Sequence, residues 1–204
     1  MLENKLIQLL EQQRWLDRLA DPLQHTVSAV LTRVPRLADV LHGRPLGHSL
    51  HAVLVPVPIG GWTVGLVLDL VGVFSRSARF HGAADLVTAI GLGGAGLAAV
   101  AGLADWSLTS GKARRVGILH ALFNVTVVGL YGASMASRLT GHRGIGVALS
   151  VLGFGLVGVS GWLGGELAYR YGVGVRKVAV DPAQGGEAVR TSPVPEDRNG
   201  APPR

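Results

Sequence analysis

Apolar positions along this chain gather in four long stretches that contain no Asp, Glu, Lys or Arg: 52–68, 86–104, 116–137 and 144–165. A helix rises 1.5 Å per residue, so about 20 apolar residues cross the roughly 30 Å core of a bilayer. Each stretch comes close to that length. We therefore predict an all-α protein, a four-helix transmembrane bundle with spans at about 50–72, 83–104, 115–137 and 143–165, inside a membrane domain 48–175.

The ends of the chain have a different pattern. Leucines recur at helical spacing in 2–20, and a second amphipathic segment follows in 23–41 with Pro35 near its middle. Neither segment is apolar enough to span, so residues 1–47 should form amphipathic helices that lie on the membrane surface or cap the domain. Partly solvated helices fit the same pattern equally well. Residues 176–204 lack apolar periodicity and are rich in Pro, Gly and charge, which predicts a disordered tail.

Composition agrees with a membrane protein. The mean hydropathy is +0.38 and only 16% of residues are charged, against about 25% in ordinary soluble domains. The net charge of +6 comes largely from arginines that flank the apolar stretches, so it does not indicate nucleic-acid binding. The chain has no cysteine, which excludes a disulfide, an iron–sulfur cluster or a thiolate metal site on it.

The basic residues also predict an orientation. Four spans place both termini on one side, here called face A, and the opposite side is face B. Nine positive residues lie near the membrane on face A and four on face B. Cytoplasmic loops carry the excess of Lys and Arg, so both termini are predicted to be cytoplasmic. The face A residues are Arg33, Arg36, Arg44, Lys112, Arg114, Arg115, Arg170, Arg176 and Lys177; those of face B are Arg76, Arg79, Arg138 and Arg143.

The same alternation of direction gathers histidines and carboxylates at face A. Imidazole and carboxylate suit zinc, iron or manganese, while two histidines can ligate haem iron from opposite sides. His51 and His120 come from different helices and are the predicted haem pair, with His48 and Asn124 beside them. The alternative is a metal site made of His48, His51, Asp105, His120 and Glu166.

Simpler roles exist for these residues. His48, Asp105 and Glu166 could be interfacial polar anchors, and Asn124 could form a helix-to-helix hydrogen bond. His120 is harder to dismiss, because a polar group inside a span costs free energy and tends to be functional. At face B, Asp69 and Asp85 should form structural ion pairs with arginines such as Arg138 or with those of the 76–79 loop.

Prolines and glycines inside the spans also require an interpretation. Pro56 and Pro58 must disturb helical hydrogen bonds. Such prolines more often produce a kink at the entry to a span than an ion-binding site. Glycines at 91, 93 and 96, and again at 153, 155 and 158, match the dinucleotide-binding spacing G-x-G-x-x-G. That motif has meaning only between a strand and a helix. Within spans, these glycines indicate close helix packing instead.

Three blocks resemble one known family. They are LHGRPLGHSLHAVLVPVPIGGWTVGLVLDL (41–70), GLADWSLTSGKARRVGILHALFNV (102–125) and GWLGGELAYRYGVGV (161–175). Together they resemble the membrane family called domain of unknown function 2231. Relatives usually read H-P-x-H-P where this chain has His48–Ser49–Leu50–His51–Ala52. The resemblance implies four membrane helices and no established activity, and some relatives are fused to Rieske or cytochrome c-like domains.

The leading hypothesis is an integral inner-membrane protein of bacteria, a redox-associated subunit that binds haem b or a transition metal and relays electrons. Such a chain would more readily be an electron carrier than an enzyme by itself. It would need a Rieske-type or other redox protein at the cytoplasmic face. The alternatives are a non-catalytic membrane scaffold or assembly factor, with no cofactor at all, and a small transporter. The sequence leaves a homo-oligomer open.

Overall fold

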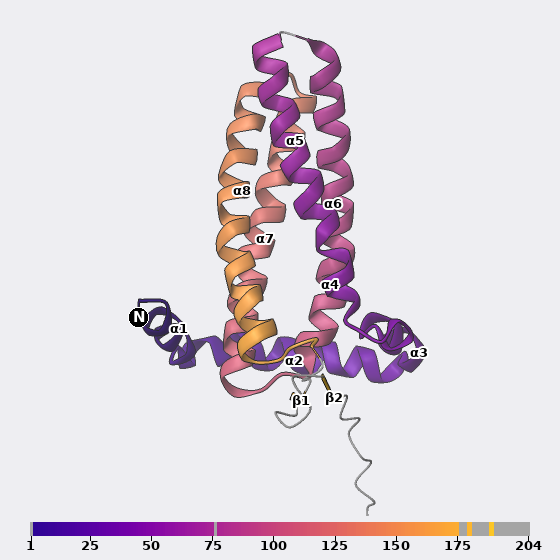
Figure 1. Ribbon diagram of the computed structural model, residues 1–204, viewed down its shortest axis with the longest axis vertical. Coiled ribbons are helices and arrows are strands. Elements are labelled where there is room, and N and C mark those ends of the chain that lie inside the picture. The colour runs from indigo at the N-terminus through magenta and orange to yellow at the C-terminus, as the bar shows by residue number, and fades with distance from the viewer. Residues whose placement is uncertain (1, 76, 176–178, 181–187, 190–204) are drawn as a thin grey trace, which may run out of the picture.

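The computed structural model describes residues 2–75, 77–175, 179–180 and 188–189. Its main feature is an upright bundle of four long helical segments (Figure 1). These are α4 and α5 together (Leu50–Leu54 and Pro56–Ser75), α6 (Ala78–Ser107), α7 (Gly111–Leu139) and α8 (Arg143–Gly165), which a π turn, η3, continues over Glu166–Arg170. Each segment is long and apolar enough to cross a membrane. The predicted all-α four-helix transmembrane bundle is therefore confirmed.

The first span is broken at Val55, between α4 and α5. Pro56 has no N–H to donate, so the helix cannot continue its hydrogen-bond ladder through this residue. Val55 N–H still bonds to His51 O at 3.0 Å, and Ser49 caps the start of α4 by accepting from Ala52 N. Pro58 is buried against α6, where a methyl group on Gly94 would lie 3.2 Å from its Cδ. The break therefore lies at the entry to the span and divides it into two helices, α4 and α5.

The bundle consists of two hairpins. The first is α4–α5 with α6, the second is α7 with α8, and each hairpin packs more extensively within itself than against the other. Small residues on α6 and α8 allow the close approach within each hairpin, as the glycine pattern predicts. Apolar side chains cover most of the outer surface of the helices, which is the arrangement that a lipid environment requires.

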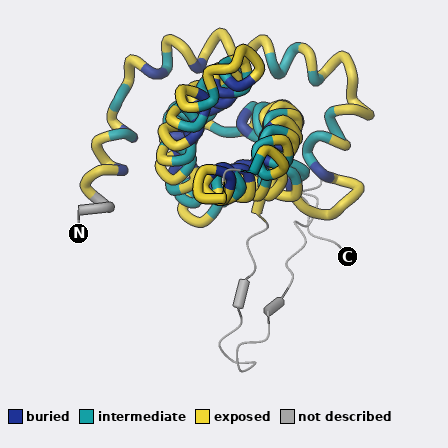
Figure 2. The backbone as a smooth tube through the Cα atoms, turned by 90° about the horizontal axis from the view of Figure 1, so that it is seen from above, coloured by how far each residue is buried: buried dark blue, intermediate teal, exposed yellow. Residues whose placement is uncertain are grey.

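The N-terminal segment crosses the face A end of the bundle and curves around it (Figures 1 and 2). It contains α1 (Leu2–Glu11), the short turn η1 (Arg14–Leu16), α2 (Asp17–Arg33), α3 (Pro35–Leu41) and the turn η2 (Arg44–Leu46). Ile7 and Leu16 are fully buried against the ends of the spans. These helices are therefore fastened to the bundle on one side and leave another side exposed.

Two acidic residues contribute to that attachment. Asp17 accepts hydrogen bonds from Arg115 at 2.7 Å and from Arg114 at 2.9 Å, and these arginines lower the pKa of Asp17 to about 2. Glu11 is buried. Burial alone would raise its pKa, but hydrogen bonds from Lys112 and from Tyr171 outweigh that effect and lower it. Both carboxylates are therefore held in their charged form against the bundle.

Only two short elements are described beyond the bundle. Strands β1 (Ala179–Val180) and β2 (Ala188–Val189) pair antiparallel. The rest of the predicted tail, residues 176–204, lies outside the described residues.

Candidate functional site between the two hairpins

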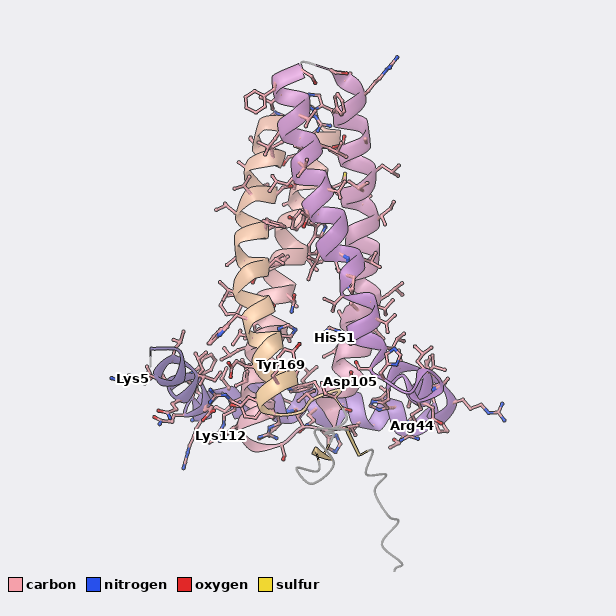
Figure 3. The ribbon with its side chains drawn as sticks, viewed as in Figure 1. Lys5, Arg44, His51, Asp105, Lys112 and Tyr169 are labelled. Carbon is pink, nitrogen blue, oxygen red and sulfur yellow. The ribbon has the colours of Figure 1, made fainter. Side chains whose placement is uncertain are left out.

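His51 projects from α4 toward the interior of the bundle, above Asp105, which lies nearer the face A end (Figure 3). Its Nδ1 lies 2.8 Å from the main-chain oxygen of Ala98 on α6. A carbonyl oxygen can only accept, so Nδ1 carries a proton, and in a neutral ring Nε2 then keeps its lone pair. The ring packs on Gly102, where an added Cβ would stand 2.8 Å from Nδ1. The first hairpin thus fixes both the tautomer and the position of this imidazole.

His120 on α7 is held in the same way by the second hairpin. Its Nδ1 lies 2.9 Å from the main-chain oxygen of Ser160 on α8, and its ring packs on Gly164, where an added Cβ would be 3.2 Å from Cε1. Asn124, one turn further along α7, donates from Nδ2 to Nε2 of His120 at 3.0 Å and to its main-chain oxygen at 2.9 Å. Again the ring nitrogen without a proton is Nε2.

The two imidazoles face each other between the hairpins. Their ring centres are 6.2 Å apart and their planes are nearly perpendicular, at 85°. Two imidazoles that bind one ion from opposite sides, at metal–nitrogen distances of about 2.0–2.1 Å, have ring centres about 6 Å apart. Metal-binding histidines almost always donate the other ring N–H to a carbonyl or carboxylate, as both rings do here. The ring-centre spacing matches that of two imidazoles on opposite sides of one ion, while Nε2 of His120 accepts from Asn124 in this structure.

The resemblance between the two histidine environments extends deeper into the membrane. Trp62 follows His51 by 11 positions, and Tyr131 follows His120 by the same 11. Their rings stack between the hairpins, with centres 4.1 Å apart and planes only 6° from parallel. Trp62 packs on Gly91 of α6 and Tyr131 on Gly153 of α8. The same arrangement, a ring from the first helix resting on a glycine of the second, therefore occurs twice in each hairpin.

A third layer near face B follows the same numbering. Asp69 and Arg138 lie 18 positions after His51 and His120 respectively. Their side chains form an ion pair at 2.5 Å and are almost fully buried. Since α4–α5 and α7 both run from face A to face B, the two hairpins form a parallel internal repeat (Figure 1).

The face B layer is a closed network of charges that takes one residue from each long helical segment. Arg138 also bonds to Asp85 of α6 at 3.0 Å, and Arg143 of α8 bonds to Asp85 and, at 3.1 Å, to Asp69. Ser134 and Ser150 accept from Arg138 at 3.1 Å each. The predicted pairing of Asp69 and Asp85 with Arg138 is confirmed. Arg143, which the sequence placed at the start of the fourth span, was not among the predicted partners.

The remaining predicted ligands lie elsewhere. His48 is exposed in the loop before α4, where Gly43 and Gly47 turn the chain with φ of 68° and 76°. Asp105 accepts from Ser49 at 2.5 Å, and Glu166 pairs with Arg170 at 2.5 Å. Among the residues that the structure describes, no three His, Asp or Glu side chains gather as a metal site would require. The five-residue metal site thus stays a prediction, and the structure brings together only its two central histidines.

One polar group at face A was missed by the sequence reasoning. His42, in the loop between α3 and η2, places Nδ1 3.3 Å from Oδ1 of Asp105. Together with Ser49 it gives each of the two oxygens of this carboxylate one polar partner. His42 and Asp105 line a hollow of about 580 Å³ at the face A end. Only the fold of the 42–49 loop reveals this contact, since His42 belongs to no span.

Comparison with known proteins identifies the family but no activity. A family model described as "Predicted membrane protein (DUF2231)" matches residues 47–177, which is more than half of the chain. The chain therefore belongs to the DUF2231 family of predicted membrane proteins, as its three blocks indicated. No curated protein and no solved structure matches the chain.

Proposed function

We propose that this DUF2231 protein is a redox-associated membrane subunit in which His51 and His120 hold one haem b iron from opposite sides. The haem would supply one-electron redox chemistry. The chain supplies two imidazoles at a fixed separation, inside a lipid-facing bundle. By itself it would carry electrons rather than transform a substrate.

The observation that carries the proposal is the equivalence of the two histidines in the repeat. Each comes from the first helix of its hairpin, bonds through Nδ1 to a main-chain oxygen of the second, and rests on a glycine four residues after that oxygen. These matching surroundings use Nδ1 of each ring, and they differ at Nε2, which in His120 accepts from Asn124. A histidine used only for packing would not require the same tautomer in both halves.

Two converging histidines favour haem over a bare ion. A haem iron takes four nitrogens from its macrocycle and needs only two axial ligands from the protein, whereas a bare transition metal needs more. Asn124 occupies Nε2 of His120 at 3.0 Å, so its amide must turn away when iron binds.

We further propose that the protein lies in the bacterial inner membrane with both termini in the cytoplasm. The excess of basic residues at face A supports this orientation. His51 and His120 are then nearer the cytoplasmic side, which is where a soluble redox partner would dock. A Rieske-type partner is one candidate, and since this chain has no cysteine the cluster would belong entirely to the partner.

The direct test is haem content in matched variants. The protein and its His51→Ala, His120→Ala and His48→Ala variants would be purified from haem-replete cells, and haem would be quantified from the absorption spectrum of the reduced pyridine complex. We expect about one haem per chain in the wild type and in His48→Ala, because His48 is exposed and outside the pair. Loss of either axial imidazole should remove most of it.

Elemental analysis of the same samples separates haem from a bare metal. A colourless wild-type protein that carries stoichiometric zinc, iron or manganese would show that the site binds a metal ion instead of haem. A colourless and metal-free wild type would contradict the proposal and leave a scaffold as the better reading. Equal haem content in all four proteins would contradict the assignment of the ligands.

A further inference from the structure

The N-terminal helices carry an apolar stripe that no part of the described chain covers. On α2, Leu19, Leu23 and Val30 lie within about 40° of each other around the helix axis at 100° per residue, and all three are exposed, Val30 by 52%. Thr26 falls in the same stripe, and its hydroxyl bonds to the main-chain oxygen of Pro22 at 2.8 Å. It therefore presents its methyl group and leaves no hydroxyl unpaired.

The helices on either side of α2 also expose apolar side chains. Leu6 and Leu9 of α1 are exposed while Ile7, between them in sequence, is buried against the bundle. On the other side of α2, Leu37 and Val40 of α3 are exposed as well. Apolar exposure over three consecutive helices is far larger than the scattered apolar residues of an ordinary surface. It indicates that something covers this face.

Charge identifies what covers it. The described acidic side chains of α1–α3 are all paired: Glu11 with Lys112, Asp17 and Asp21 with Arg114, and Asp39 with Arg44. The basic side chains are exposed and have no hydrogen-bond or ion-pair partner among the described residues. These residues are Lys5, Arg14, Arg18, Arg33 and Arg36. The segment thus turns its negative charge to the bundle and its positive charge outward.

The position of the segment matches the edge of a bilayer. α2 reaches the face A end of the spans, where Gln24 donates to the main-chain oxygens of Ser107 and Thr109 at 3.0 and 2.7 Å. Lys5 projects sideways at the same level (Figure 3), and the segment arcs around the bundle when viewed along its axis (Figure 2). Trp15 is 53% exposed there, and tryptophan is enriched at membrane–water interfaces.

We propose that α1–α3 form a platform that lies in the headgroup region of the face A leaflet and binds anionic lipid. The apolar stripe rests on the acyl boundary, continuous with the apolar outer surface of the spans. The five basic side chains contact lipid phosphates, with their aliphatic stems covering apolar surface. This surface depends on membrane insertion alone and not on the proposed haem.

The chain has no cysteine, so single spin labels can be placed without background. We would label Leu23→Cys and Val30→Cys in the stripe, with His25→Cys as the matched control. His25 is exposed on the same helix, about 160° from Leu23. The full chain would be reconstituted in vesicles of phosphatidylcholine alone, or of equal parts phosphatidylcholine and phosphatidylglycerol. Collision with lipid-soluble oxygen and with a water-soluble nickel chelate reports the depth of each label.

We expect the ratio of oxygen to nickel accessibility to be several-fold higher at 23 and 30 than at 25, and to increase further with phosphatidylglycerol. Replacing Arg14, Arg18, Arg33 and Arg36 by Gln should remove that increase. Equal nickel access at all three positions would place the stripe in water and overturn the proposal. Labels at 23 and 30 shielded from both reagents would overturn it as well, in favour of a second copy or a protein partner.

Discussion

Asp69 and Arg138 occupy equivalent positions in the two hairpins, and their buried side chains pair with each other at 2.5 Å. The repeat therefore places opposite charges where strict symmetry would place like ones. This pair, the Trp62–Tyr131 stack and the His51–His120 pair join the hairpins at three successive depths. The first two layers fasten the halves together, and the His51–His120 layer is the one in which we propose a ligand, although Asn124 occupies Nε2 of His120 in this structure.

Breaking the Asp69–Arg138 layer near face B should destabilise the bundle. Arg138→Ala leaves Asp69 buried without its main partner, at a cost of about 3–5 kcal/mol. Because the two positions are equivalent in the repeat, the exchange Asp69→Arg with Arg138→Asp should recover part of the lost stability. Thermal unfolding in detergent measures both. Arg79→Ala, at an exposed residue near face B, is the control. An exchange variant no better than Arg138→Ala would argue against the equivalence.

Glycines under the histidine rings should not tolerate a methyl group. Gly102→Ala places Cβ 2.8 Å from Nδ1 of His51, so we expect a loss of about 1–3 kcal/mol together with reduced cofactor content. At Gly96, on the same helix, an added Cβ meets nothing within 4 Å. There the substitution should be neutral or stabilising by about 0.5–1 kcal/mol, as Gly→Ala is in helices. Thermal unfolding of the two variants, compared side by side, tests this; equal effects would contradict the packing.

Removing the hydroxyl of Tyr131 should have little effect. This oxygen and Nε1 of Trp62 are buried without a hydrogen-bond partner among the described residues. Tyr131→Phe removes an unsatisfied group while keeping the stack, so stability should change by less than about 0.5 kcal/mol or should increase. Trp62→Ala should cost about 3–5 kcal/mol. Thermal unfolding measures these changes, with Tyr169→Phe, at an exposed residue, as the control. A large loss of stability in Tyr131→Phe but not in the control would show that the Tyr131 hydroxyl is hydrogen-bonded in the membrane.

The attachment of α1 and α2 should persist in moderate acid. The pKa of Asp17 is lowered to about 2 by Arg115 and Arg114. A lowered pKa stabilises the docked state fully above the ordinary Asp pKa of about 3.9, and that stabilisation is lost as pH falls toward 2. The distance between spin labels on Gln12→Cys and Thr140→Cys should thus stay constant from neutral pH to about 4.

Asp17→Asn provides the complementary arm, because the variant should loosen the segment already at neutral pH. A label distance that changes in the wild type near pH 6, or one that is unaffected by Asp17→Asn, would show that other contacts hold the segment.

Much of the fold was readable from the sequence because hydropathy is a local property. An uncharged run of about 20 residues specifies a span whatever its neighbours are, and the alternation of four spans put His51 and His120 at the same end. Pro56 likewise had to interrupt its helix for a local reason, the missing N–H.

The repeat could not be read in the same way. Its two halves share His51 with His120, but elsewhere they use Trp for Tyr and Asp for Arg, so residue identity hides the correspondence. His48 and Asp105 were placed with the histidine pair by depth alone. The depth of a residue in the membrane does not specify where its side chain points. The turns at Gly43 and Gly47 set the position of His48, and the hydroxyl of Ser49 binds Asp105.

The central claim is that one iron lies between His51 and His120, and low-temperature electron paramagnetic resonance of the oxidised wild-type protein tests it most directly. With the two ring planes 85° apart, we predict a low-spin ferric signal of the highly anisotropic type that perpendicular axial imidazoles produce, lost in His51→Ala and in His120→Ala. A protein from haem-replete cells with no ferric haem signal, or with one that both variants retain, would contradict the account.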